Sequence, residues 1–120
     1  MGSGQYQQLK VWQKSIDFVS QIYAVTRSFP TEERYLLVDQ IRRCAISIPS
    51  NIAEGSYRQT DKEFVHFLAI ARGSAAELET QLLIAKNLHY IDESTCTGLS
   101  DKVVELLKML AVLIKRITQD

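Results

Sequence analysis

Apolar residues recur every three or four positions in four separate stretches of this 120-residue chain. The four series are Leu9, Trp12, Ile16, Val19 and Tyr23; Leu37, Ile41, Cys44, Ile48 and Ile52; Phe64, Phe67, Ala71, Ala75, Leu78, Leu82 and Ala85; and Leu99, Val103, Leu106, Leu110, Leu113 and Ile117. Steps of three and four place the members of a series on one face of an α-helix. No comparable stretch alternates with a period of two, so the pattern predicts helices and no strands.

The stretches between these series carry signals that end one helix and start the next. Pro30 ends the first helix, and Thr31 is the expected cap of the second. Thr60 begins a T-x-x-E sequence, which is typical of a capping box at the start of a third helix. Asp92 or Ser94 is the expected cap of the fourth. We therefore predict an all-α, antiparallel up-down-up-down four-helix bundle with helices of about 22 to 29 residues.

Pro49 falls inside the second series. A proline in a helix interior removes a backbone donor and crowds the preceding turn, which costs about 3 kcal/mol. The apolar series nevertheless keeps its phase on both sides of the proline, as it would not across a true break. We therefore expect one helix from Glu32 to Gly55 or Ser56 with a kink at Pro49.

Composition narrows the class of protein. The chain has 14 basic and 14 acidic residues, and this balance argues against a strong, non-specific nucleic-acid binder. It lacks an apolar run of about 18 residues, so we expect no membrane contact. Cys44 and Cys96 are far apart and outside any CxxC motif, which indicates a reducing cytoplasm and, for Cys44, a place in the core. We expect one domain, residues 1–120, with no secretory signal and with Met1–Gly4 as a cloning remnant.

A line of polar residues runs beside the apolar series of the second and third helices. This polar seam consists of Arg43, Ser47, Asn51, Glu54, Arg58, Arg72, Ser74 and Glu77, with Gln81 continuing it. One interpretation is a hydrogen-bonded network that fixes helix register, with Glu54 and Glu77 paired to arginines. The second is a recognition site for a partner. The third is a small-ligand or catalytic site that uses Asn51, Glu54 and Glu77.

A row of small residues, Ala69, Gly73 and Ala76, lies next to the seam. Because glycine in a helix interior costs roughly 1 kcal/mol relative to alanine, the row predicts close approach of another backbone near Gly73.

Motifs for catalysis or metal binding are sparse. His66 follows Glu63 in the one Glu-x-x-His pair, whereas di-metal bundles use two such pairs. We find no Ser-His-Asp or Cys-His arrangement and no glycine-rich phosphate loop. The sequence therefore predicts a protein that is not an enzyme and has no cofactor.

Three quoted stretches point to a family. "SIPSNIAEG" (47–55), "IARGSAAELETQL" (70–82) and the opening "LKVWQKSIDFVSQIY" (9–23) closely resemble proteins encoded in intervening sequences of bacterial 23S ribosomal RNA genes, the S23 ribosomal protein family. The resemblance covers nearly the whole chain. It implies a four-helix bundle without enzymatic activity that forms homo-oligomers, commonly ring-shaped pentamers.

The resemblance also implies a partner. A related group, the accessory proteins of diversity-generating retroelements, is similar in fold and works with a reverse transcriptase and nucleic acid. Those relatives are markedly basic, whereas this chain is neutral. This difference argues against strong RNA binding, and RNA, or a protein that handles RNA, is the partner that the resemblance implies besides the chain itself.

The residues supply two further expectations. The candidate RNA contacts are Lys10, Lys14, Arg27, Arg34 and Arg42, which a ring would repeat into a circle of positive charge. Tyr6 and Tyr57 are candidates for stacking on unpaired bases. The apolar residues that lie off the main series, and so predict an oligomer, are Val11, Phe18, Val25, Val65, Ile70, Val104 and Val112.

Overall fold

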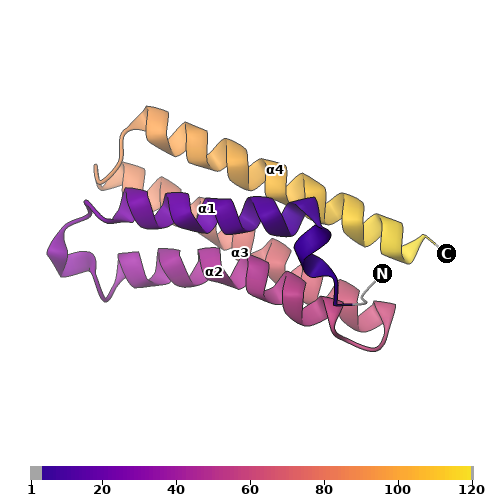
Figure 1. The fold of residues 1–120 in the computed structure, drawn as a ribbon. Coiled ribbons are helices and arrows are strands. Elements are labelled where there is room, and N and C mark those ends of the chain that lie inside the picture. The colour runs from indigo at the N-terminus through magenta and orange to yellow at the C-terminus, as the bar shows by residue number, and fades with distance from the viewer. Residues whose placement is uncertain (1–3, 120) are drawn as a thin grey trace.

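A computed structural model describes residues 4–119 of the chain. It consists of four α-helices: α1 (Lys10–Thr26), α2 (Leu37–Ser56), α3 (Asp61–Asn87) and α4 (Glu93–Thr118) (Figure 1). Short 3₁₀ turns at Tyr6–Gln8 and Thr31–Glu33 precede α1 and α2. The described range contains helices and no strand, as the apolar spacing predicts.

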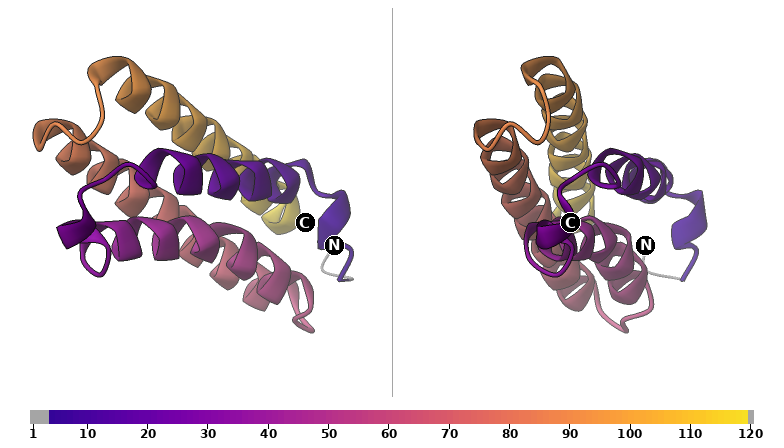
Figure 2. Two further views of the ribbon diagram at one scale, coloured as in Figure 1. Left: turned by 60° about the vertical axis from the view of Figure 1, so that its left-hand side comes forward. Right: turned by 90° about the vertical axis from the view of Figure 1, so that its left-hand side faces the viewer.

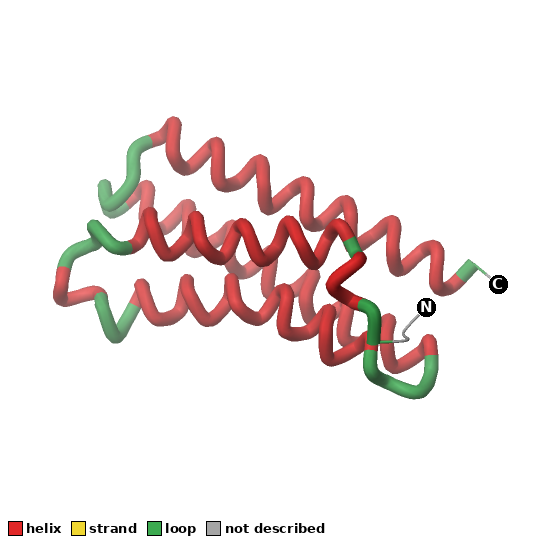
Figure 3. Tube along the Cα trace, in the orientation of Figure 1, coloured by secondary structure: helices red, strands yellow, loops and turns green. Residues whose placement is uncertain are grey.

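The helices form an up-and-down bundle. Each helix packs on the next one along the chain, and α1 also contacts α4, which closes the bundle. The start of α1 and the end of α4 lie at the same end of the molecule (Figure 2). Short loops join the helices (Figure 3), and the bundle is 47 Å long and 23 by 20 Å across. The predicted fold class is therefore confirmed.

The helix lengths differ from the prediction in the first half of the chain. α3 and α4 have 27 and 26 residues, but α1 has 17 and α2 has 20. The expected start of the second helix at Glu32 is wrong, because Leu36 takes a non-helical conformation (φ −117°, ψ −103°) and separates the 3₁₀ turn from α2. Thr31 consequently caps neither element with its side chain.

Helix α2 continues through the buried Pro49 and ends at Ser56, which confirms the predicted continuity and end. A kink at the proline stays a prediction. The neighbouring cap signals are also confirmed. The Thr60 hydroxyl accepts a hydrogen bond from the Glu63 backbone N–H at 3.1 Å, and the Asp92 carboxylate accepts one from the Thr95 N–H at 2.7 Å.

The apolar core shows one clear departure from the expected pattern. In α1 the buried positions are Val11, Ser15, Phe18, Ile22 and Thr26. The predicted series from Trp12 to Tyr23 lies instead along the edge of α1, half-buried or exposed. Ser15 and Thr26 tolerate burial because their hydroxyls donate to helix carbonyls, of Trp12 and Ile22, at 2.7 Å each.

Gly55 lies at a close contact between α2 and α3. A β-carbon built at this position would lie 2.8 Å from Phe67 Cβ and 2.9 Å from Phe64 Cδ1. Only glycine leaves room for this contact, so the end of α2 can pack directly on the start of α3.

The start of the chain is attached to α2. The Gly4 N–H donates to the Ser56 carbonyl at 3.0 Å, and the Tyr6 ring lies edge-on to Trp12 and Tyr57 at centroid distances of 5.3 and 5.9 Å. Gly4 thus takes part in the fold, whereas the other residues of the expected cloning remnant, 1–3, lie outside the described residues.

Candidate functional site

Three residues of the polar seam form a hydrogen-bonded centre between α2 and α3. The Ser47 and Ser74 hydroxyl oxygens lie 2.8 Å apart across the two helices. The Asn51 side-chain amide donates to the Ser47 carbonyl at 2.8 Å and to the Ser47 hydroxyl at 2.9 Å. All three are half-buried. The bonds link the helices at a defined register, and a typical hydrogen bond of this kind stabilises by about 1 kcal/mol.

A second group of the seam gathers around the half-buried Cys44. Its thiol donates to Glu77 Oε2 at 3.6 Å, and the Gln81 amide donates to the Cys44 sulfur at 3.4 Å. Burial raises the pKa of the Cys44 thiol, the Gln81 hydrogen bond lowers it and the Glu77 carboxylate raises it again, with a net upward shift. The sulfur is therefore held as a thiol. Cys44 is half-buried at the α2–α3 boundary and packs against the core, so its predicted place in the core is confirmed only in part.

Gln81 is the most buried polar residue of this group, with 7% of its surface exposed. Its Oε1 atom is buried and has no hydrogen-bond partner among the described residues. The network that would fix register is therefore complete at Ser47 and incomplete at Gln81.

Three charged members of the seam, Arg43, Glu54 and Arg58, lie on the surface, and each pairs with a residue four positions away. Arg58 contacts Glu54 at 2.9 Å and stacks over the Phe67 ring, with its guanidinium carbon 4.6 Å from the ring centroid. Arg43 contacts Asp39 at 2.9 Å. The expected Glu54–arginine pair is thus present.

The same expectation fails for the second carboxylate of the seam. Glu77 makes no ion pair among residues 4–119 and instead accepts a bond from Cys44. Arg72 is exposed and forms no ion pair with either carboxylate of the seam, Glu54 or Glu77, among the described residues. The seam consequently consists of a small hydrogen-bonded network and two exposed ion pairs, Arg43–Asp39 and Arg58–Glu54.

The close approach predicted at Gly73 is wrong within this chain. Gly73 is exposed, and no heavy atom lies within 4 Å of a β-carbon built there. The row of small residues therefore faces outward, and the close approach occurs at Gly55.

Three of the candidate RNA contacts lie together at one end of the bundle. Arg27, Arg34 and Arg42 line a hollow of about 330 Å³ beside the loop that joins α1 to α2. Arg42 is fixed in place: its Nε donates to the Thr26 hydroxyl at 2.9 Å, and its guanidinium carbon lies 4.3 Å from the centroid of the Tyr23 ring. Arg27 and Arg34 are exposed.

The other two candidates lie elsewhere on α1. Lys10 begins the helix, roughly 25 Å from Arg27 at the helical rise of 1.5 Å per residue. Lys14 pairs with Glu105 of α4 at 3.2 Å, and both side chains are about half exposed. The five residues therefore do not form one patch in a single chain.

The apolar residues expected to lie outside the core divide in a similar way. Val11 and Phe18 belong to the core, and Val25 and Val65 are half-buried. Ile70, Val104 and Val112 are exposed, as predicted. Sequence reasoning missed three further exposed residues at the end of α3 and directly after it: Leu83, Ile84 and Leu88 are 49, 43 and 47% exposed, against 39% for Ile70. Together with Gly73 they are called the α3 outer face below.

The described residues offer no candidate for a metal site or for a membrane-spanning helix. No group of three or more His, Cys, Asp and Glu side chains within residues 4–119 could hold a metal ion. Within the same range, no helix combines the length and the apolar character that a membrane span requires.

Comparison with protein families gives a match over most of the chain. The model of the 23S rRNA-intervening sequence protein family matches residues 7–112. The chain belongs to this family. The match spans α1, α2, α3 and most of α4, so it includes the quoted stretches that carry the resemblance.

A solved structure of the S23 ribosomal protein family has the same fold as this 23S rRNA-intervening sequence family member. It is a protein of unknown function from Bacteroides thetaiotaomicron, with a TM-score of 0.81 and 28% identity over 88% of this chain and 95% of that one. A comparison with curated proteins finds no match.

Proposed function

We propose that this member of the 23S rRNA-intervening sequence family is a non-enzymatic scaffold that assembles with copies of itself. The α3 outer face carries the proposal. Helix α3 buries apolar residues on its inner side and exposes four large ones on its outer side. Monomers rarely expose contiguous apolar surface, so the neighbouring exposed residues Leu83, Ile84 and Leu88 favour a covering partner.

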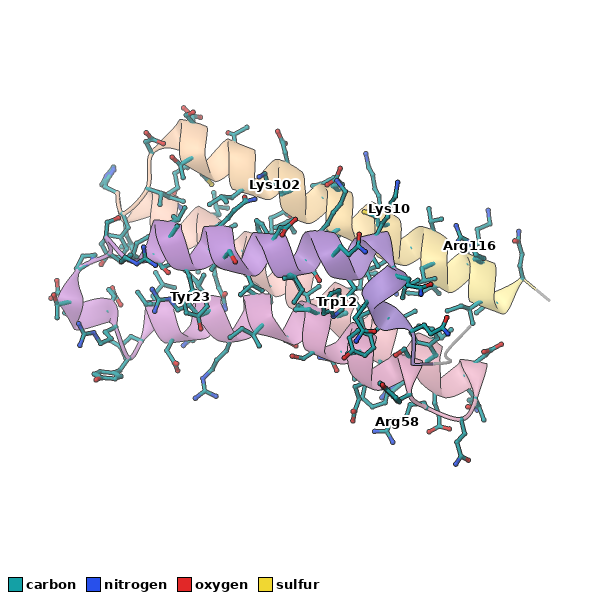
Figure 4. All side chains as sticks on the ribbon, viewed as in Figure 1. Lys10, Trp12, Tyr23, Arg58, Lys102 and Arg116 are labelled. Atoms are coloured by element: carbon teal, nitrogen blue, oxygen red, sulfur yellow. The ribbon has the colours of Figure 1, made fainter. Side chains whose placement is uncertain are left out.

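A second apolar surface supports assembly between unlike faces. The series Trp12, Ile16, Val19 and Tyr23 runs along one edge of α1, where Ile16 is 39% exposed, the other three are half-buried and Tyr23 packs under Arg42 of α2 (Figure 4). Ile46 of α2 is exposed as well. Helices α1 and α3 are diagonal in the bundle and do not contact each other. Contact between two different surfaces gives a head-to-tail arrangement, which closes into rings. Five subunits is the number that the family resemblance implies.

Light scattering after size exclusion tests the proposal. We expect a mass several times the 13.7 kDa of one chain at micromolar concentration. Ile84→Glu should lower that mass, because each large apolar side chain removed from a contact costs about 1.5–3 kcal/mol. Thr97→Glu, at an exposed position of α4, is the matched control and should leave the mass unchanged. A wild-type mass of a single chain would refute self-assembly.

Contact with RNA is the second candidate function, and the hollow lined by Arg27, Arg34 and Arg42 favours it. Three guanidiniums beside one hollow suit phosphate oxygens, and Arg42 is already oriented by Thr26 and Tyr23. A ring would repeat the hollow once per subunit and so raise the local positive potential without changing the net charge.

Fluorescence anisotropy with labelled single-stranded RNA separates the two groups of basic residues. We expect binding at about 50 mM salt that weakens steeply as salt is added. Arg27→Glu/Arg34→Glu should abolish it, and Lys10→Glu/Lys14→Glu should reduce it far less. Absence of binding by the wild-type protein at low salt would leave assembly as the proposed function and remove RNA.

A further inference from the structure

A hollow lies between the start of α1 and the last turns of α4. It has a volume of about 440 Å³. Its floor is apolar and consists of Leu9, Val11, Met109 and Leu113. Val11 and Leu113 are nearly buried, and Leu9 and Met109 are half-buried. The floor is therefore a part of the core that remains open to one side.

The path of the N-terminal segment explains why this groove is open. The 3₁₀ turn before α1 leads toward α2, where Gly4 bonds to Ser56 and Tyr6 packs against Tyr57. Helix α4 continues to Thr118. At this end of the bundle α4 runs past the start of α1, so α1 does not cover the last turns of α4 (Figure 1).

Three cations surround the apolar floor. Lys108 and Arg116 flank the exposed Val112 at steps of four residues along α4, and Lys10 approaches from α1. Figure 4 shows Lys10 and Arg116 at the same end of the bundle. None of the three makes an ion pair within residues 4–119, and no carboxylate lines the groove. Glu105, one turn before Lys108 on α4, is paired with Lys14.

We propose that this groove binds a small amphipathic anion, an unbranched apolar chain that carries one carboxylate or similar anionic group. Ligand sites in proteins are mostly apolar hollows of roughly 300–1,000 Å³ with a few polar groups that fix orientation. This groove has that size and lining. In this proposal the apolar tail of the ligand lies on the floor formed by Val11, Met109 and Leu113. Its anionic group lies among Lys10, Lys108 and Arg116. The site is separate from the α3 outer face and from the arginine hollow.

Calorimetric titration with hexanoate, octanoate and decanoate, all below their micellar concentrations, tests the proposal. Each methylene added should strengthen binding about fourfold until the groove is full, because burial of one methylene has that equivalent in affinity. Octanoate should bind at least about fivefold more tightly than 1-octanol, which has the same chain without the charge. Absence of binding by decanoate, or equal affinity for octanoate and 1-octanol, would overturn the proposal.

Two variants locate the site, and one residue provides a matched control. Val112 is 57% exposed, so Val112→Asp should fold normally and weaken octanoate binding at least about tenfold by charge repulsion at the floor. Arg116→Gln should weaken it about threefold, whereas Lys115→Gln, which removes the neighbouring charge outside the groove, should not. Equal effects of these two glutamine variants would overturn the assignment, even if Val112→Asp failed to fold.

Light scattering on the same samples distinguishes this proposal from self-assembly. If the groove binds the anion, Val112→Asp loses octanoate binding and keeps the wild-type mass. If Val112→Asp instead dissociates the assembly, and octanoate binds only to the dissociated chain, a second copy covers the groove and the proposal is overturned.

Discussion

Gly55→Ala is expected to destabilise the bundle. The new β-carbon would lie 2.8 Å from Phe67 Cβ and 2.9 Å from Phe64 Cδ1, so α2 and α3 must move apart. Overpacking of this kind costs about 1–3 kcal/mol. Alanine returns about 0.5–1 kcal/mol through its better helix propensity. The expected net loss in the free energy of unfolding therefore lies between about 0 and 2.5 kcal/mol.

Gly73→Ala and Gly98→Ala are the matched controls. Both glycines lie inside helices, and no heavy atom lies within 4 Å of a β-carbon built at either position. Each substitution should therefore stabilise the chain by about 0.5–1 kcal/mol.

Urea unfolding followed by far-UV circular dichroism measures all three variants. The protein concentration must be the same throughout, because self-assembly makes stability depend on concentration. The reasoning is refuted if Gly55→Ala is as stable as the two controls. A Gly73→Ala variant that is less stable than Gly98→Ala, and that loses mass in light scattering, would identify Gly73 as part of a subunit contact.

Three further predictions concern single residues. Thr60→Ala removes the cap of α3 and should cost about 1 kcal/mol in the free energy of unfolding, measured in the same way, with no change expected for an exposed position such as Thr97→Ala. Glu54→Ala should cost no more than about 0.5 kcal/mol, because the Glu54–Arg58 pair is exposed; a loss above about 1 kcal/mol would show that the pair belongs to a buried network. The raised pKa of Cys44 leaves less of its sulfur as thiolate. Iodoacetamide should therefore alkylate Cys44 more slowly than it alkylates glutathione at about pH 8.5, as measured by peptide mass spectrometry. Faster alkylation of Cys44 would contradict the upward shift.

The second half of the fold could be predicted from sequence because its helices carry one dominant signal. In α4, every member of the series from Leu99 to Ile117 is buried, and Asp92 caps the helix as expected. The same holds for most of α3, which starts at the predicted Thr60 cap. In these two helices local propensity, capping residues and the apolar pattern agree, so the sequence predicts both the ends of each helix and its buried face.

Helix α1 could not be read correctly because it carries two competing patterns. The series from Leu9 to Tyr23 is apolar throughout, whereas the true core face includes Ser15 and Thr26. Sequence reasoning favours the more apolar series. The sequence does not reveal that both hydroxyls donate hydrogen bonds to backbone carbonyls, which offset the cost of burying them. Nor does it reveal that the edge of α1 packs beside α2.

The sequence predicts where the residues of the candidate site lie, but it does not predict their hydrogen-bond partners. Helical spacing correctly brings Ser47, Asn51 and Ser74 to one boundary. Spacing alone does not tell which partner a long side chain takes, so the Cys44–Glu77 contact was missed. Gly73 and Gly55 were likewise indistinguishable in sequence, since only the positions of Phe64 and Phe67 decide which glycine is crowded.

The contact between Tyr6 and Trp12 has a spectroscopic consequence. Trp12 is the one tryptophan of the chain, and it lies at the junction of the N-terminal turn, α1 and α2. Its emission therefore reports the local environment of that junction, whereas far-UV circular dichroism reports the helices as a whole. If the N-terminal turn detaches before the bundle unfolds, the fluorescence transition precedes the dichroism transition, and the separation between them measures the free energy with which the turn is held on α2.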